Sequence, residues 1–182
     1  MSTASAKSKP PLTITQPACL VDGSDAQFRQ LIHAMVAFSA RLLSVRDGFG
    51  TLMGITGIQY SILVSIAHQK PHTKVTINKV ASHLHLSGPF VTIETGKLHK
   101  MGLVEKTTNP KDKREVLLAI TPEGRKLFEQ IAPDQQKIND VLFEGITARE
   151  FKTLCSIFER MVDNGDRASM DIIHLIARQS KA

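Results

Sequence analysis

The positively charged side chains of this 182-residue chain are concentrated in one stretch of sequence. Between Lys70 and Arg114 there are nine lysines and arginines against three acidic residues, whereas the rest of the chain has 14 of each sign. The stretch ends in a densely charged run, Lys111-Asp112-Lys113-Arg114. Clustered lysine and arginine side chains are typical of a protein that binds a polyanion such as nucleic acid. A basic surface that only contacts solvent would carry the same charges, so charge alone leaves both interpretations open.

A helix-turn-helix pattern precedes this charged run. Thr76 can cap a short helix whose apolar residues recur at positions i, i+3, i+4 and i+7, namely Ile77, Val80, Ala81 and Leu84. His85-Leu86 predicts a tight turn, after which Ser87 caps a second helix with Pro89 in its first turn. That helix is expected to end at Gly102 and to bury Val91, Thr95 and Leu98. Two helices joined by so short a turn are typical of a DNA-binding motif.

A β-hairpin is predicted directly after the second helix of this motif. Two strand-like runs, 103–108 and 115–120, flank a turn at 109–114 that contains a proline and the charged run. Thr121 and Pro122 then form the cap and the first residue of another helix. A hairpin in this position is a wing beside the helix-turn-helix, and the charged turn would form its tip.

Helices with apolar stripes are predicted on both sides of this central lobe. The first is capped by Ser24, runs to about Asp47 and is followed by a glycine-containing loop. Thr56 and Gln59 form a capping box that opens the next helix, which is expected to end at 70–72. The last helix opens at Thr147, and Cys155 lies in its apolar stripe, where we expect it to be a core residue.

We therefore expect a mainly α fold with a small β-hairpin wing, in which a winged helix-turn-helix lobe is flanked by N- and C-terminal dimerisation helices. The terminal stripes have little to pack against in one small lobe, so a homodimer is the natural way to bury them. The expected organisation is a disordered tail at 1–23, a dimerisation helix and loop at 24–54, the DNA-binding lobe at 55–121, and dimerisation helices at 122–182.

Several segments of the chain match one known pattern of motifs. They are Gly54-Ile55-Thr56 with Gln59-Tyr60 and Leu63, the stretch from Leu86 to Leu98 with Gly102-Leu103-Val104, Asn109-Pro110, Asp112-Lys113-Arg114, and Ile120 to Gly124. In these segments the chain resembles the MarR family of winged helix-turn-helix transcriptional regulators. The resemblance implies a repressor whose two-fold dimer grips a pseudo-palindromic site on double-stranded DNA. The two cysteines cannot make a disulfide framework and nothing argues for export, so we expect a cytoplasmic protein.

The helical spacing of the motif indicates which residues of its second helix contact DNA, and the resemblance implies the contact made by the wing. The second helix of the motif would enter the major groove, where Thr92 can bond a base or phosphate, Ile93 can touch a thymine methyl group, and Lys97 can reach guanine or phosphate. Arg114 would enter the minor groove, held by a salt bridge to Asp112. The full expected set is Thr76, Ser87, Pro89, Phe90, Thr92, Ile93, Gly96, Lys97, Lys111, Asp112, Lys113 and Arg114.

Two positions of the second helix depart from the family pattern. Ile93 stands where a basic residue is frequent, and Glu94 stands where an apolar residue is usual. We expect Glu94 to pair with Lys97, three residues further along the helix. These departures mean that the sequence specificity of relatives does not transfer to this chain.

A small-molecule effector is a further expectation from the resemblance. An aromatic or acyl-bearing anion, including a coenzyme A thioester, would bind between the dimerisation helices and the DNA-binding lobe. The candidate residues are His33, Phe38, Arg41, Met53, Tyr60 and His68. Each of them has an ordinary alternative role in packing or at the surface.

Other classes of protein fit the sequence less well. The motifs of phosphate loops, serine hydrolases and zinc proteases are absent, so we expect no enzyme, no cofactor and no metal. No apolar run is long enough to span a membrane, and the N-terminus lacks a secretory signal. Two alternatives stay open: a redox-sensing repressor that uses Cys19, and a basic protein that binds DNA without sequence preference.

Overall fold

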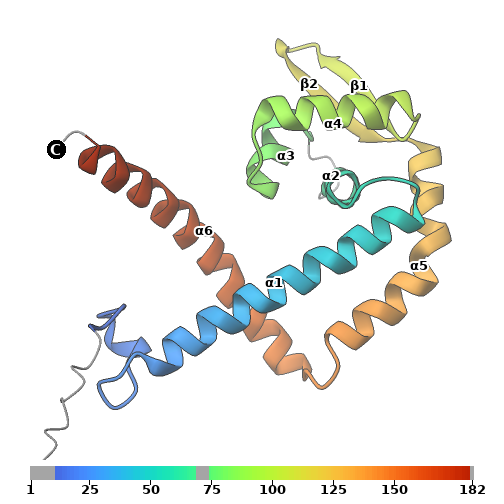
Figure 1. Cartoon of the computed structure of the whole chain (residues 1–182). Coiled ribbons are helices and arrows are strands. Elements are labelled where there is room, and N and C mark those ends of the chain that lie inside the picture. The colour runs from blue at the N-terminus through green and yellow to red at the C-terminus, as the bar shows by residue number, and fades with distance from the viewer. Residues whose placement is uncertain (1–10, 69–73, 181–182) are drawn as a thin grey trace, which may run out of the picture. The chain divides into compact units, whose positions relative to one another are not determined.

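The computed structural model describes residues 11–68 and 74–180 (Figure 1). Its elements are η1 (Pro17–Cys19), α1 (Ala26–Leu52), α2 (Gly57–Ala67), α3 (Ile77–Leu84), α4 (Gly88–Lys100), β1 (Val104–Asn109), β2 (Asp112–Ile120), α5 (Pro122–Leu142) and α6 (Ala148–Gln179). The predicted fold class, mainly helical with a two-stranded hairpin, is confirmed. The chain divides into two compact units, one ending at Ala132 and the other beginning at Pro133, and α1 belongs to the first.

The helix boundaries around the turn of the motif follow the predicted caps. The side chains of Thr56, Thr76 and Ser87 each accept the backbone N–H three residues further on, and Thr56 forms the complete capping box with Gln59. His85 ends α3 in the left-handed conformation with φ of 53°. The positions 70–72, expected to end α2, lie outside the described residues, and the described part of α2 ends at Ala67.

The core of the first unit is built around α2, most of whose residues are buried. Helices α1, α3 and α4 and strand β2 all contact it. The most completely buried aliphatic side chains come from these elements and from β1, and include Ile62, Leu63, Val80, Val91, Leu98 and Val104. This packing places α3 and α4 against α2, so the outer face of α4 lies toward solvent.

Helix α1 is longer than the sequence pattern predicts. We expected a loop after Asp47, but α1 continues through Gly48 and Gly50 to Leu52. A β-carbon at Gly50 would lie 2.7 Å from the backbone carbonyl carbon of Thr56, so the glycine permits the close approach of α1 to the start of α2. Packing of this kind outweighs the cost of about 1 kcal/mol that glycine adds in a helix.

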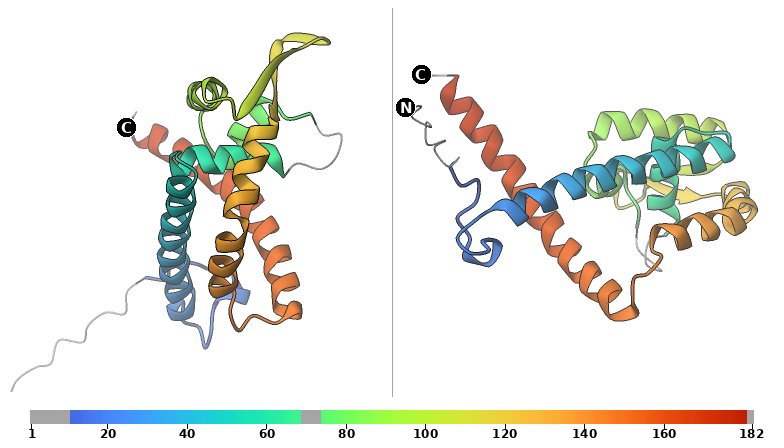
Figure 2. Two further views of the ribbon diagram at one scale, coloured as in Figure 1. Left: turned by 90° about the vertical axis from the view of Figure 1, so that its right-hand side faces the viewer. Right: turned by 60° about the horizontal axis from the view of Figure 1, so that its bottom comes forward.

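The wing is a tight antiparallel hairpin that projects beyond α4 (Figure 2). Its strands pair in one register from Val104 with Ile120 to Thr108 with Val116, and the register then shifts so that Asn109 pairs with Asp112 and Pro110 and Lys111 form the turn. The regular pairing thus ends where the predicted turn at 109–114 begins, and the strands extend into that turn only through the shifted pair of Asn109 and Asp112. The Asn109 amide explains the extension, because it donates to Glu115 at 2.7 Å while its oxygen accepts the backbone N–H of Lys111.

The segment before α1 carries local structure that its composition did not indicate. Asp25, rather than Ser24, is the N-cap residue of α1, and its carboxylate accepts both the backbone N–H and the hydroxyl of Thr13. Arg29 pairs with the same carboxylate. These bonds lower the pKa of Asp25 to about 2, the two from Thr13 contributing most. Part of the expected tail, 11–23, is thus attached to the start of α1.

The second unit contains the end of α5 and the whole of α6. Thr147 and Glu150 form a complete capping box, and the hydrogen bonds from Thr147 lower the pKa of Glu150. No residue of α6 is buried in the single chain. Cys155, which we expected in a core, is exposed for that reason. The exposed apolar side chains of α6 are Phe151, Ile157, Phe158, Val162, Met170, Ile172, Ile173, Leu175 and Ile176.

Among the described residues, no helix taken singly has the length and apolar character needed to cross a membrane. Within residues 11–68 and 74–180, the pair α1 and α2, which meet at a bend of 87°, is the one combination that passes on length and composition together.

Candidate nucleic-acid interface

Helix α4 presents one buried and one exposed face. Val91, Thr95 and Leu98 are buried, as the sequence predicted. The predicted DNA-contacting side chains of this helix and its cap lie on the exposed side, namely Ser87, Pro89, Phe90, Thr92, Ile93 and Lys97, with Gly96 half-buried among them. The structure therefore gathers the expected contact residues of α4 on one accessible surface.

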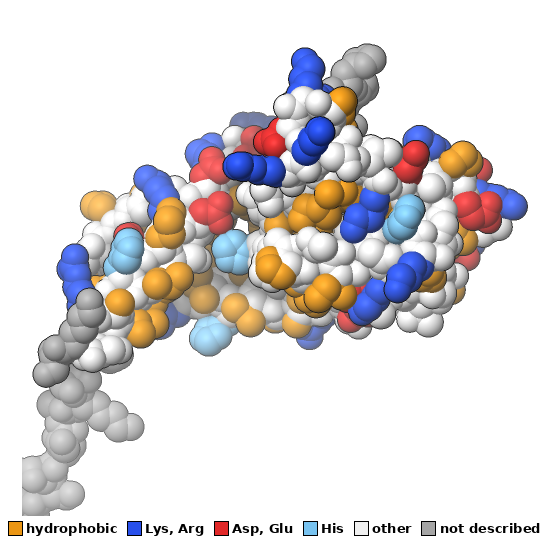
Figure 3. Space-filling model, turned by 90° about the horizontal axis from the view of Figure 1, so that it is seen from above, with side chains coloured by type: hydrophobic (Ala, Val, Ile, Leu, Met, Phe, Trp, Pro, Cys, Tyr) orange, Lys and Arg blue, Asp and Glu red, His pale blue; other side chains and the backbone are white. Residues whose placement is uncertain are grey.

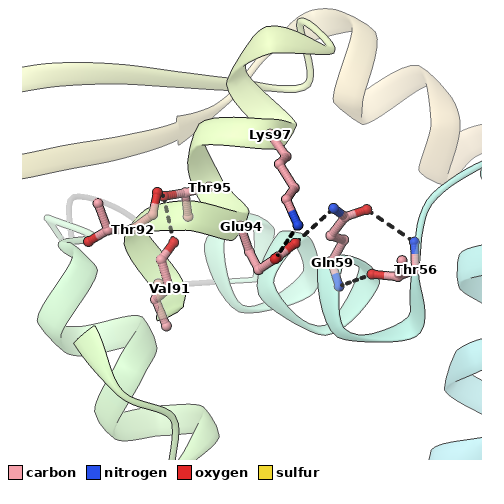
Figure 4. Close-up of polar contacts among 7 residues, drawn as sticks. All are labelled: Thr56, Gln59, Val91, Thr92, Glu94, Thr95 and Lys97. Atoms are coloured by element: carbon pink, nitrogen blue, oxygen red, sulfur yellow. Dashed lines mark hydrogen bonds and ion pairs between the residues drawn. The ribbon is translucent and has the colours of Figure 1, made fainter. Parts of the chain in front are cut away.

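A buried polar network connects α4 to α2 (Figure 4). Glu94 is only 5% exposed, and its two carboxylate oxygens accept from Gln59 Nε2 at 2.8 Å and from Lys97 Nζ at 2.7 Å. Gln59 Oε1 accepts the backbone N–H of Thr56, so the network includes the capping box of α2. The expected pair of Glu94 with Lys97 is confirmed.

The network lowers the pKa of Glu94. The hydrogen bond from Lys97 is the largest cause, burial opposes it, and the bond from Gln59 and the Lys97 charge add to it. A carboxylate at this depth is stable only because both oxygens are bonded. We had not predicted Gln59 as its partner, although an acidic residue on the buried face of α4 was a signal that a partner must exist.

The hydroxyl groups of two α4 threonines bond to the backbone of their own helix, and Figure 4 draws the bond made by Thr95. Thr92 Oγ1 donates to the Gly88 carbonyl at 2.9 Å, and Thr95 Oγ1 donates to the Val91 carbonyl at 2.7 Å. Lys106 of β1 donates to Thr95 Oγ1 at 3.3 Å, which links the wing to α4. Thr92 therefore has its hydroxyl hydrogen already engaged.

An open hollow lies where α3, α4 and the wing meet. Its volume is about 310 Å³, and its lining comprises Thr76, Ile77, Asn78, Gly88, Pro89, Thr92, Arg114, Glu115 and Val116. The hollow brings Arg114 of the wing to the same place as the first turns of two helices. Thr76 is 7% exposed and bonds the Lys79 N–H, so its hydroxyl acts first as a helix cap.

The wing displays the predicted charged run on its surface. Lys111, Asp112, Lys113 and Arg114 are all exposed. Lysine and arginine side chains gather on the protruding hairpin in Figure 3. The expected salt bridge is wrong in detail, because Asp112 Oδ1 accepts the backbone N–H of Arg114 at 3.0 Å and stabilises the turn. Arg114 also contributes to the lining of the hollow.

The six expected effector residues do not form one cluster. Met53 and Tyr60 belong to the core, where Tyr60 packs against Phe49 and Phe128 with ring centroids 5.6 and 6.3 Å apart. Burial raises the pKa of Tyr60, and the guanidinium of Arg46, 5.1 Å above the ring, opposes this rise.

The other four effector candidates lie elsewhere on the surface. His68 is exposed and its ring lies 5.9 Å from that of Phe128. His33, Phe38 and Arg41 are exposed along the first two thirds of α1, and Arg41 donates to the Ala37 carbonyl of its own helix. Eleven residues, about 16 Å along the helix axis, separate Phe38 from the buried Phe49. In residues 11–68 and 74–180, no three His, Cys, Asp or Glu side chains are grouped to hold a metal ion.

Comparison with known proteins identifies the fold and the family. A model of the MarR family matches residues 53–115. The chain is 30% identical to the HTH-type transcriptional regulator YwhA of Bacillus subtilis over 50% of its own length and 65% of that protein, so it spans just under two thirds of this relative. CouR from Rhodococcus jostii, solved bound to p-coumaroyl-CoA, superimposes with a TM-score of 0.66 at 23% identity, covering 76% of this chain and 96% of that one.

Two proteins named MarR also match the chain. Wild-type MarR from E. coli in its apo form has a TM-score of 0.54 and 26% identity, over 72% of this chain and 93% of that one. The multiple antibiotic resistance protein MarR of Salmonella typhimurium is 30% identical over 73% of this chain and 89% of its own length. Because that match runs through the helix-turn-helix and beyond it on both sides, the chain belongs to the MarR family of transcriptional regulators.

Proposed function

We propose that this protein is a sequence-specific transcriptional repressor that binds double-stranded DNA as a homodimer. The observation that carries the proposal is the placement of the exposed face of α4 beside the basic wing, around one open hollow. A helix with such a face fits the major groove, and an arginine on an adjacent wing fits the minor groove. The local excess of positive charge supports attraction to the phosphate backbone.

The proposed dimer rests on the apolar surface that the single chain leaves exposed. Side chains such as Phe158, Val162 and Ile173 are between 42% and 63% exposed, which is costly for a monomer in water. A second copy of the chain would cover them. We expect sedimentation of the full chain at micromolar concentration to give a dimer, and Val162→Lys to shift it toward monomer, whereas Lys152→Ala should leave it unchanged.

The DNA interface is tested by removing one cation from the wing. Arg114→Ala should weaken binding to duplex DNA roughly tenfold for each wing, because a charge-assisted contact is lost. It should also reduce the slope of log affinity against log salt by about 0.9 per wing. Fluorescence anisotropy with a labelled duplex measures both quantities. Arg149→Ala, at the start of α6, is the matched control, and equal losses from the two variants would contradict the assignment of the wing.

We further propose that a small aromatic or acyl-bearing anion releases the protein from DNA. Two structural neighbours support this proposal: CouR binds p-coumaroyl-CoA, and 6-hydroxynicotinic acid regulates the DNA binding of Bordetella bronchiseptica BpsR. In this chain, Arg41 and His33 offer charge for a carboxylate, and Phe38 offers an apolar wall. The test is titration of the protein–DNA complex with aromatic acids and their coenzyme A thioesters; no release by any of them would contradict this proposal.

Redox control through Cys19 is the second candidate. Cys19 is a half-buried free thiol close to the start of α1. If an oxidant alone releases DNA, and Cys19→Ser abolishes that release, redox sensing replaces the small-molecule effector. Binding without any preference among duplex sequences would instead favour a nonspecific DNA-binding protein.

A further inference from the structure

The centre of the exposed face of α4 is apolar. Pro89, Ile93 and Gly96 are spaced i, i+4 and i+7, which places them on one strip of the helix surface. None of these side chains can form a hydrogen bond. Ile93 is 58% exposed, and a β-carbon at Gly96 would meet no atom within 4 Å, so the strip is open beside Ile93. Hydrophobic side chains over α4 are visible in Figure 3.

The polar side chains that border this strip are engaged within the protein. The Thr92 hydroxyl donates to Gly88, which leaves its methyl group as the other feature of that side chain. The Lys97 ammonium is paired with the buried Glu94 carboxylate, so its charge is neutralised where it stands. Lys100 lies seven residues beyond Ile93, about 10 Å along the helix axis. The middle of α4 therefore offers a base edge mainly apolar surface.

Only one feature of the major groove is complementary to an apolar side chain. Base edges there present hydrogen-bond donors and acceptors, and thymine alone adds a methyl group. We propose that α4 recognises its site through the 5-methyl groups of thymines, with Ile93 as the specificity-determining residue and the Thr92 methyl beside it. This inference rests on the proposed DNA binding. It assigns sequence preference to α4 and leaves most of the phosphate attraction to the wing.

The experiment removes the methyl group and nothing else from the base. The full chain selects its preferred duplex from a pool of random 30-base-pair sequences. The selected duplex is then synthesised with deoxyuridine in place of thymidine at each position in turn, and affinities are measured by anisotropy at fixed salt. Wild-type protein should lose about fourfold in affinity for each contacted methyl group, the value of one buried methylene.

Ile93→Ala completes the test as a double-mutant cycle. Because Ile93 is exposed, its truncation leaves no cavity and should not disturb folding. The variant should bind the thymidine duplex more weakly and should no longer distinguish it from the deoxyuridine duplex at the contacted position. Met101→Ala, another exposed apolar truncation just after α4, should keep the full discrimination of the wild type.

The outcomes separate this inference from the proposed function. Equal affinity of the wild type for thymidine and deoxyuridine duplexes, or unchanged discrimination in Ile93→Ala, overturns the inference while DNA binding stands. Selection that enriches no sequence, with binding to every duplex, also overturns it. Absence of binding to any duplex overturns the proposed function, and this inference with it.

Discussion

The buried carboxylate of Glu94 should be worth several kcal/mol to the folded state. Glu94→Ala removes the acceptor of the Gln59 amide, which is 6% exposed and cannot reach water instead. Leaving such a donor unsatisfied costs about 1–3 kcal/mol. The lost methylene adds about 0.8 kcal/mol. The pair with Lys97, whose side chain is 56% exposed, contributes at most about 1 kcal/mol.

The expected destabilisation by Glu94→Ala is therefore about 2–5 kcal/mol at pH 7. Glu94→Gln is the matched variant, because its amide oxygen can still accept from Gln59 at nearly the same volume. It should cost about 1 kcal/mol or less. Urea unfolding followed by circular dichroism measures the free energy of unfolding, with all variants at one protomer concentration because dimerisation contributes to stability.

The pH dependence gives a second measurement on the same group. The pKa of Glu94 is lowered on folding, so its ionised form stabilises the protein above its unfolded pKa of about 4.5. That stability is lost as the pH falls below this value toward the lower folded pKa. Glu94→Gln should remove this part of the acid profile. A loss below about 0.5 kcal/mol for Glu94→Ala, or equal losses for both variants, would refute the reasoning.

Three further predictions concern charge and close packing. Glu94→Gln releases Lys97 from its ion pair, so it should steepen the salt dependence of DNA binding by up to about 0.9 per protomer, and an unchanged slope in anisotropy titrations would contradict the neutralisation of Lys97. Gly50→Ala should destabilise the protein by about 1–3 kcal/mol, because the new β-carbon would lie 2.7 Å from the backbone at the start of α2. Gly96→Ala should stabilise it by up to about 1 kcal/mol, because a β-carbon there meets open space and alanine favours the helix. Thermal and urea unfolding compare the free energies of unfolding of the two variants. The pKa of Asp25 is lowered to about 2, so its ionised carboxylate stabilises the fold above pH 4, and this stability is lost as the pH falls from 4 to 2. Asp25→Asn should therefore reduce the pH dependence of unfolding in that interval. An unaltered acid-unfolding profile would count against the Thr13 contact.

Many elements of the DNA-binding lobe were predictable because short-range interactions determine them. A cap such as Ser87 bonds an N–H only three residues away, and the periodicity of Val91 and Leu98 identifies the buried face of α4. The charge of the wing follows from composition in the same way. The lengths of α1 and of the hairpin strands were less well predicted, because glycine and proline are weak indicators where packing or side-chain bonds intervene.

The parts that only the tertiary structure decided depend on residues distant in the sequence. Gln59 and Glu94 are 35 residues apart, and their bond exists because α2 and α4 pack together. Tyr60 looked like a pocket residue by type, but the rings of Phe49 and Phe128 enclose it in the core. Sequence spacing describes which side chains share one helix face. It does not describe which faces meet, because that is set by the burial of apolar surface over the whole lobe.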